Sequence, residues 1–403
     1  MSASASASPA PQPRWFLALF ALAFAGGAVA YVPLLTVLLP QRLAELQGGE
    51  DVAALAQVTF LGALAASLAN IAAGTLSDVS GTRRPWILAG LVISGLLLVA
   101  LEDARSLDEV VLLIMAWQVG LNLMLGPLLA WAGDCFPDSQ KGELGGALAL
   151  APALGALAGS LVTYGGLVAP AARLELVALL VAALVLPAVL LGGGRARAEL
   201  MAPRPAVAAP EDAASPLPWR GVVARMWAAR LLVQVAEGGM FAFLLYWLRA
   251  LAPGYPEHGA ANIFSLVLLS AVPLSLLVGR WSDRHGRPVL PLVLAALACA
   301  AGLAVMAAAS GLAMAITGYV LFALSAAVFL ALHAGHTLRV LPAPQHRGRD
   351  LGLFNLTNTV PGMVMPGLTV LLVPHFGYSG LFVLFAALAL ASAALLAGTR
   401  RPA

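Results

Sequence analysis

Two charged side chains interrupt an apolar stretch near the middle of the chain. Glu237 lies in the sequence Gln234-Val-Ala-Glu-Gly-Gly, and Arg230 precedes it by seven residues. A charged group at the centre of a bilayer costs about 3 kcal/mol or more, so each one there needs a reason. One reason is chemical, because a buried carboxylate can take up and release a proton near neutral pH. The alternative is structural, with a protonated or paired carboxylate bracing two helices.

Arg230 and Glu237 would share one face of a helix. Seven residues span about 10 Å of helix, so the two side chains do not touch directly. A water molecule or a substrate anion could bridge them. Alternatively, Arg230 lies near the membrane surface and extends its charged end to water.

Other polar residues in apolar segments are candidates for the same cavity. His333 and His336 are three residues apart, and Gln118 and Asn122 are four apart, so each pair shares a helix face. The histidines either relay protons or bind solute, or they are hydrogen-bonded packing residues. The amides either line a cavity or join helices to one another. The candidate cavity residues are Glu237, Arg230, Gln234, Gln118, Asn122, Asn358, His333 and His336.

Composition restricts the class of protein. Of 403 residues, 61% are hydrophobic and 10% are charged, whereas a soluble protein carries roughly a quarter charged residues. The chain is therefore expected to be an integral membrane protein. Its basic residues lie in short loops and form no stripe that could follow phosphates, which excludes nucleic acid as a partner. Cys135 and Cys299 have no metal-ligand spacing, and we expect neither a metal nor a cofactor.

Apolar runs of about 20 residues, long enough to cross a bilayer, predict twelve membrane-spanning helices. We expect a tail at 1–13, an N-terminal bundle at 14–193, a cytoplasmic linker at 194–225, a C-terminal bundle at 226–399 and a tail at 400–403. The predicted spans are 15–39, 53–76, 86–102, 109–133, 143–164, 173–193, 226–250, 260–279, 289–309, 312–338, 351–373 and 379–398.

The distribution of basic residues predicts the orientation. With the N-terminus inside, 17 of the 22 Lys and Arg residues fall in interior loops and tails, and four fall outside. This bias predicts that both termini are cytoplasmic.

A short polar motif occurs twice, between the second and third spans and again between the eighth and ninth. Gly74, Asp78 and Gly81 each meet an identical residue 205 positions later. Pro137 and Gln140 meet Pro342 and Gln345 at the same offset. Two separate loops that share one offset indicate two homologous halves. The motif residues are Gly74, Asp78, Gly81, Arg83 and Arg84 in the first copy and Gly279, Asp283, Arg284, Gly286 and Arg287 in the second.

The motif predicts a gate. Its glycines allow helix ends to approach closely, and an aspartate can accept hydrogen bonds from free amides at a helix N-terminus. By symmetry we expect Asp78 to face the start of the eleventh helix and Asp283 the start of the fifth. These contacts would hold the cytoplasmic side closed. Val79 replaces an expected charge in the first copy, so we expect the Asp283 contact to contribute more.

These residues resemble the loop motif of the major facilitator superfamily, most closely in the second copy. The resemblance implies an all-α membrane protein with twelve transmembrane helices in two pseudo-symmetric six-helix bundles. Gly126-Pro127 with Asp134 is similar to the fourth-helix end of sugar and glycoside cation symporters. The stretch from Ala147 to Gly155 instead resembles the fifth-helix motif of drug/proton antiporters.

The resemblance implies a secondary transporter that moves a small organic solute by alternating access, with proton coupling. Its partners would be the solute, protons and the lipid of a bacterial inner membrane, and we expect a monomer. Two alternatives stay open: a drug or metabolite efflux antiporter, and a non-transporting assembly factor on the same scaffold. The chain contains no HExxH or GxSxG motif with suitable flanks, so we expect no enzyme.

Overall fold

The structure is a computed structural model that describes residues 10–47, 52–164, 168–201, 219–253, 255, 257–341 and 344–399. All regular secondary structure in these residues is helical. Within the described residues, ten helices are long and apolar enough to cross a membrane. The seventh and eleventh predicted spans correspond to α10 and the first part of α14, which include side chains outside the described set.

The N-terminal half forms one bundle. Its first helix continues through a π-helical turn, Leu34–Leu38, and its fifth span is made by α6 and α7 in succession. The elements are α1 (Arg14–Pro33), α2 (Leu39–Gln47), α3 (Val52–Val79), α4 (Arg84–Ala100), α5 (Leu107–Cys135), α6 (Lys141–Leu148), α7 (Leu150–Thr163) and α8 (Arg173–Leu191).

The C-terminal half forms the second bundle, and the short helix α9 (Ala198–Met201) precedes it. The long helix α14 contains a bend at Gly377, whose φ of 65° lies in the left-handed region that favours glycine. This bend separates the eleventh and twelfth spans. The elements are α10 (Trp219–Leu251), α11 (Glu257–His285), α12 (Val289–Ala307), α13 (Leu312–Val340) and α14 (Arg347–Ala397).

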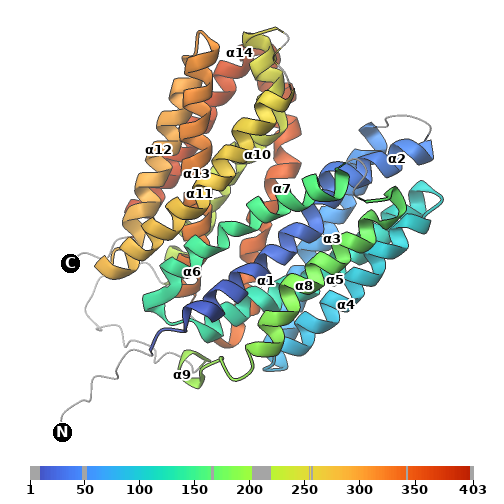
Figure 1. Ribbon diagram of the computed structural model, residues 1–403. Helices are drawn as coiled ribbons and strands as arrows, with labels where there is room; N and C mark the ends of the chain where they lie inside the picture. Colours follow the sequence, from blue (N-terminus) through green and yellow to red (C-terminus); the bar gives the residue numbers. More distant parts are fainter. Residues whose placement is uncertain are drawn as a thin grey trace.

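The two bundles meet at one end of the molecule and diverge toward the other (Figure 1). We name the end where α1 begins and α14 ends the terminal face, and the opposite end the far face. Polar contacts join the bundles near the terminal face, including a hydrogen bond of 2.9 Å between Ser67 on α3 and Thr359 on α14.

Glycines allow the two bundles to touch backbone to backbone. A Cβ atom added to Gly74 would lie 2.1 Å from the Gly348 carbonyl oxygen, and one added to Gly279 would lie 2.2 Å from the Gly142 oxygen. Real Cβ atoms do not approach an oxygen that closely. The α3–α14 and α6–α11 contacts therefore depend on glycine, and they occupy equivalent places in the two halves of the chain.

Three predicted boundaries differ from the structure. α3 and α11 extend beyond the predicted spans 53–76 and 260–279, so Asp78 and Asp283 lie in the last helical turns rather than in loops. α10 begins at Trp219, inside the segment predicted as linker. Residues 1–9 and 202–218 lie outside the described residues. Of the predicted tail, Gln12 is buried, and its side chain donates to the carbonyl oxygens of Cys135 and Arg195.

The motif glycines adopt the turn that the sequence predicts. Gly81 and Gly286 have φ values of 66° and 61° and lie within two residues of the ends of α3 and α11. Side chains rarely adopt this backbone conformation, which accounts for glycine at both positions.

Gly74→Val tests the backbone contact between α3 and α14. Because the new side chain meets the Gly348 carbonyl, we expect the bundles to separate at the terminal face. A cysteine placed at the buried position Ser67 should then react at least about tenfold faster with an impermeant maleimide added at that face. Gly311→Ala is the control, since nothing lies within 4 Å of its added Cβ. Equal labelling rates in the two variants would contradict the role of this contact.

Candidate functional site: a terminal lock and a central polar cluster

Two aspartates bind the free amides of helix N-termini in the opposite bundle. Asp78 accepts from the backbone N–H groups of Gly348 and Arg349 at 3.0 and 2.9 Å. Asp283 accepts from those of Gly142 and Glu143 at 3.0 and 2.8 Å. The predicted facing of each aspartate is confirmed. We call these four hydrogen bonds the terminal lock.

The terminal lock has a physical basis in the helix ends that it uses. The first amides of a helix have no partner within the helix, and the helix dipole places partial positive charge there. Gly348 and Arg349 directly follow the first residue of α14, and Gly142 and Glu143 directly follow the first residue of α6. Each aspartate therefore satisfies two amides that have no partner within their own helix.

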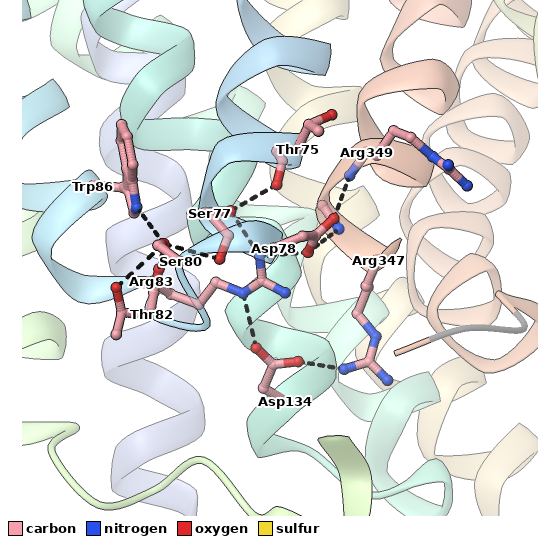
Figure 2. Close-up of polar contacts among 12 residues, drawn as sticks. Thr75, Ser77, Asp78, Ser80, Thr82, Arg83, Trp86, Asp134, Arg347 and Arg349 are labelled. Atoms are coloured by element: carbon pink, nitrogen blue, oxygen red, sulfur yellow. Dashed lines mark hydrogen bonds and ion pairs between the residues drawn. The ribbon is translucent and has the colours of Figure 1, made fainter. Parts of the chain in front are cut away.

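Ion pairs neutralise the aspartate of the first copy (Figure 2). Arg83 pairs with Asp78 at 2.7 Å and with Asp134 at 3.0 Å, and these side chains are almost fully buried. Asp134 also pairs with Arg347 from the other bundle. The cluster thus contains two carboxylates and two guanidinium groups and joins α3, α5 and α14.

The second copy is neutralised differently. Arg339 on α13 pairs directly with Asp283, and Arg280 pairs with Glu143 across the bundle interface at 2.8 Å. Arg284 and Arg287, which the sequence placed in the gate, have exposed side chains.

The remaining motif arginine acts within its own bundle. Arg84 donates to the carbonyl oxygen of Val189 at 2.8 Å. It thereby attaches the start of α4 to the end of α8 and takes no part in the terminal lock.

A central polar cluster lies on the C-terminal bundle. Arg230 on α10 donates to Gln234 and Thr357 at 3.1 Å, to the Leu330 carbonyl at 3.2 Å and to Asn358 at 3.4 Å. Its partners come from α10, α13 and α14. The interpretation of Arg230 as a residue that extends to water at the membrane surface does not fit these contacts.

The amides of the central polar cluster hold one another in place. Gln234 donates to Asn358 at 2.6 Å, and Asn358 donates to Asn355 at 2.6 Å. Asn358 is exposed, whereas the next residue, Thr359, contacts Ser67 of the opposite bundle. The cluster therefore adjoins, along α14, a contact between the two bundles.

Glu237 lies seven residues after Arg230 on α10, about 10 Å further toward the far face. It is half-buried, and among the described residues its carboxylate makes no hydrogen bond or ion pair. It lies within electrostatic range of Arg230 and of Tyr31 on α1, in the opposite bundle. Glu237 is thus a partly buried carboxylate of α10 within reach of charged and polar groups of both bundles.

Gln118 and Asn122 lie elsewhere, inside the N-terminal bundle. Both are buried, and Asn122 donates to the Gln118 carbonyl oxygen at 2.8 Å while accepting from Asn70 on α3 at 2.8 Å. Asn70 and Asn122 thus join α3 to α5. This geometry favours the alternative in which the amides connect helices.

His333 is a packing residue in this structure. Its Nε2 donates to the Met226 carbonyl oxygen at 3.0 Å, and its Nδ1 lies 3.1 Å from the Thr337 hydroxyl. Both ring nitrogens therefore have hydrogen-bond partners, one on α10 and one on α13. This geometry favours the packing alternative. His336 is also buried, and its Nδ1 has no hydrogen-bond partner among the described residues.

No metal centre is evident in the part of the chain that the structure describes, where no three His, Cys, Asp or Glu side chains gather in a group. The two polar assemblies, the terminal lock and the central polar cluster, are the features that bear on function.

Comparison with known proteins gives a family match to the C-terminal part of the chain. The family profile described as Major Facilitator Superfamily matches residues 238–403. A search of curated protein sequences finds no significant match.

Several solved structures share the fold over nearly the whole chain. The human organic anion transporter MFSD10 (TETRAN) is 16% identical with a TM-score of 0.74, covering 96% of this chain and 100% of that one. A bacterial homologue of the iron transporter ferroportin, in an outward-facing state, is 15% identical with a TM-score of 0.72, covering 95% and 98%. The proton:xylose symporter XylE, bound to 6-bromo-6-deoxy-D-glucose, is 13% identical with a TM-score of 0.72, covering 96% of each chain.

The predicted resemblance to the major facilitator superfamily is matched by the family profile over residues 238–403. The predicted all-helical fold is confirmed over nearly the whole chain, which has the fold of these solved transporters.

Asp283→Asn tests the terminal lock. An amide side chain keeps one oxygen acceptor but presents an NH₂ group to the second backbone amide, so one charge-assisted hydrogen bond of about 1.5–3 kcal/mol is lost. We expect the population open at the terminal face to rise at least about tenfold, measured by maleimide labelling of a cysteine at Ser67. Asp103→Asn, at an exposed position near the far end of α4, should leave labelling unchanged. Unchanged labelling in Asp283→Asn would show that the lock does not hold this face.

Proposed function

We propose that this protein is a proton-coupled secondary transporter that moves a small polar organic solute by alternating access. The observation that carries the proposal is Glu237, a half-buried carboxylate within the apolar helix α10 that has no hydrogen-bond partner among the described residues. A carboxylate in that position can exchange protons with whichever side the opening faces. A structural carboxylate would instead be expected to have a fixed partner.

The arginine distribution supports a cytoplasmic position for the terminal face. Arg83, Arg280, Arg339 and Arg347 all lie at this face, and the positive-inside rule places such residues toward the cytoplasm. On this orientation the two bundles meet at the cytoplasmic side and diverge toward the outside (Figure 1). The terminal lock is then the cytoplasmic gate, and we take the solute to enter between the diverging parts of the bundles.

The cargo is proposed only as a class. The neighbours are described as transporters of an organic anion, of iron and of a sugar, and at these identities they share only the fold with this chain. The guanidinium and amide groups of the central polar cluster favour a polar solute over a hydrophobic drug. The same cluster argues against a non-transporting scaffold, since side chains that serve no ligand are seldom kept polar at this depth.

Glu237→Gln tests proton coupling. Glutamine keeps the volume and hydrogen-bonding capacity of the side chain but cannot release a proton, so the step that couples transport to the gradient is lost. We expect uptake into proteoliposomes driven by an imposed pH gradient to fall at least about tenfold, while exchange of solute without a gradient continues. The solute is first found by a thermal-shift screen against sugars, amino acids and drugs.

Glu45→Gln is the matched control. Glu45 is an exposed carboxylate in α2, paired only with Arg42, so the substitution removes an equal charge far from the central polar cluster. Uptake in this variant should equal that of the wild type. Wild-type uptake that ignores the pH gradient, or full gradient-driven uptake by Glu237→Gln, would refute proton coupling.

A further inference from the structure

Arg230 differs from the four arginines around the terminal lock. At the terminal face, Arg83, Arg280, Arg339 and Arg347 each pair with a carboxylate. Arg230 has no carboxylate within ion-pair distance in the described part of the chain, and all four of its hydrogen-bond acceptors are neutral. A guanidinium group in this setting carries a positive charge that the protein itself does not match at close range.

The hydrogen bonds of Arg230 leave part of its donor capacity unused. A guanidinium group has five N–H donors. Nε–H is shared between Gln234 and Thr357, one Nη1–H goes to the Leu330 carbonyl and one Nη2–H goes to Asn358. One N–H on each terminal nitrogen therefore has no acceptor among the described residues. Two N–H groups on the two terminal nitrogens are the arrangement that binds a carboxylate or a similar oxyanion through two hydrogen bonds.

The position of Arg230 makes this charge relevant to the cargo. Asn358, which accepts from Arg230, is an exposed residue of α14 and precedes Thr359, which bonds to Ser67 of the opposite bundle. Glu237 lies about 10 Å further along the same helix, on the same face. A solute that entered between the bundles would meet Glu237 first and Arg230 at the base.

We propose that Arg230 is the binding subsite for an anionic group, a carboxylate or similar oxyanion, of the transported solute. Gln234, Thr357 and Asn358 are positioning residues that hold the guanidinium plane by accepting from its other N–H groups. The proposal rests on the proposed function, because it takes the opening between the bundles as the path of the solute.

The two charges of α10 then act on the anion with opposite sign. Arg230 attracts it, and an ionised Glu237 repels it across roughly 10 Å. Removing the Glu237 charge should therefore strengthen anion binding by up to about tenfold, whereas removing the Arg230 charge should abolish it. This opposite response distinguishes a charge-based site from a general effect of mutating a buried cluster.

The test uses the full chain in nanodiscs and matched pairs of probes. D-glucuronate is compared with D-glucose and benzoate with benzyl alcohol, with sodium sulfate as the inorganic anion, and the thermal unfolding midpoint is measured over a range of concentrations. At least one organic anion should raise the wild-type midpoint while its neutral partner does not. The effect should be lost in Arg230→Gln, weakened in Arg230→Lys, which keeps the charge without the two-pronged geometry, and strengthened in Glu237→Gln.

Several outcomes would overturn the subsite. These are no anion-dependent shift in the wild type, equal shifts from the neutral partners, an undiminished anion effect in Arg230→Gln, or a shift from sulfate alone. If Arg230→Gln does not fold, Arg230→Lys and Glu237→Gln still decide, because a charge-based site requires them to change in opposite directions. Gradient-driven uptake is measured separately, so intact uptake without anion preference refutes this subsite and leaves the proposed function standing.

Discussion

Two carboxylates that bind free helix amides determine how the rest of this molecule is arranged. Asp78 and Asp283 each accept from two backbone N–H groups of the opposite bundle, and the adjoining glycines bring the backbones close enough for this. All four hydrogen bonds lie at the terminal face. The bundles are therefore joined at one end and can diverge at the other, and any motion that opens the terminal face must break these charge-assisted bonds.

In both copies of the terminal lock the charge of the aspartate is neutralised by arginine, but the arginines come from different positions in the two halves. Asp134 and Arg339 occupy equivalent positions, 205 residues apart, yet carry opposite charges. In the first copy Asp134 accepts from Arg83 and Arg347, whereas in the second Arg339 pairs with the lock aspartate itself. The sequence predicts a weaker first copy because Val79 lacks the charge expected there. The Val79 side chain is 83% exposed and therefore faces away from the bundle interface. The buried ion pairs of the first copy give no structural reason to rank it below the second.

Features of the structure that follow from a sequence repeat or from residue spacing could be predicted from the sequence. The shared offset identified the facing of Asp78 and Asp283 because symmetry relates the two halves, and the apolar runs located the helices. Spacing along a helix shows that Gln118 and Asn122 share a face, but not that α3 covers that face. Arg230 meets Thr357, 127 residues away, through a contact that no sequence pattern records. Such partners depend on tertiary packing, so the central polar cluster could be named in advance only in part.

The most direct test of this account is a pair of spin-label distance measurements on the full chain. One pair of labels joins Val79 and Arg284, which are exposed at the terminal face, and the other joins Tyr164 and Phe376, which are exposed toward the far face. With the terminal lock intact, the first distance should be short and narrowly distributed and the second long. When Asp78→Asn and Asp283→Asn are combined, the first should lengthen and the second shorten. Distances that stay unchanged in the double variant would contradict the claim that the lock holds the two bundles together.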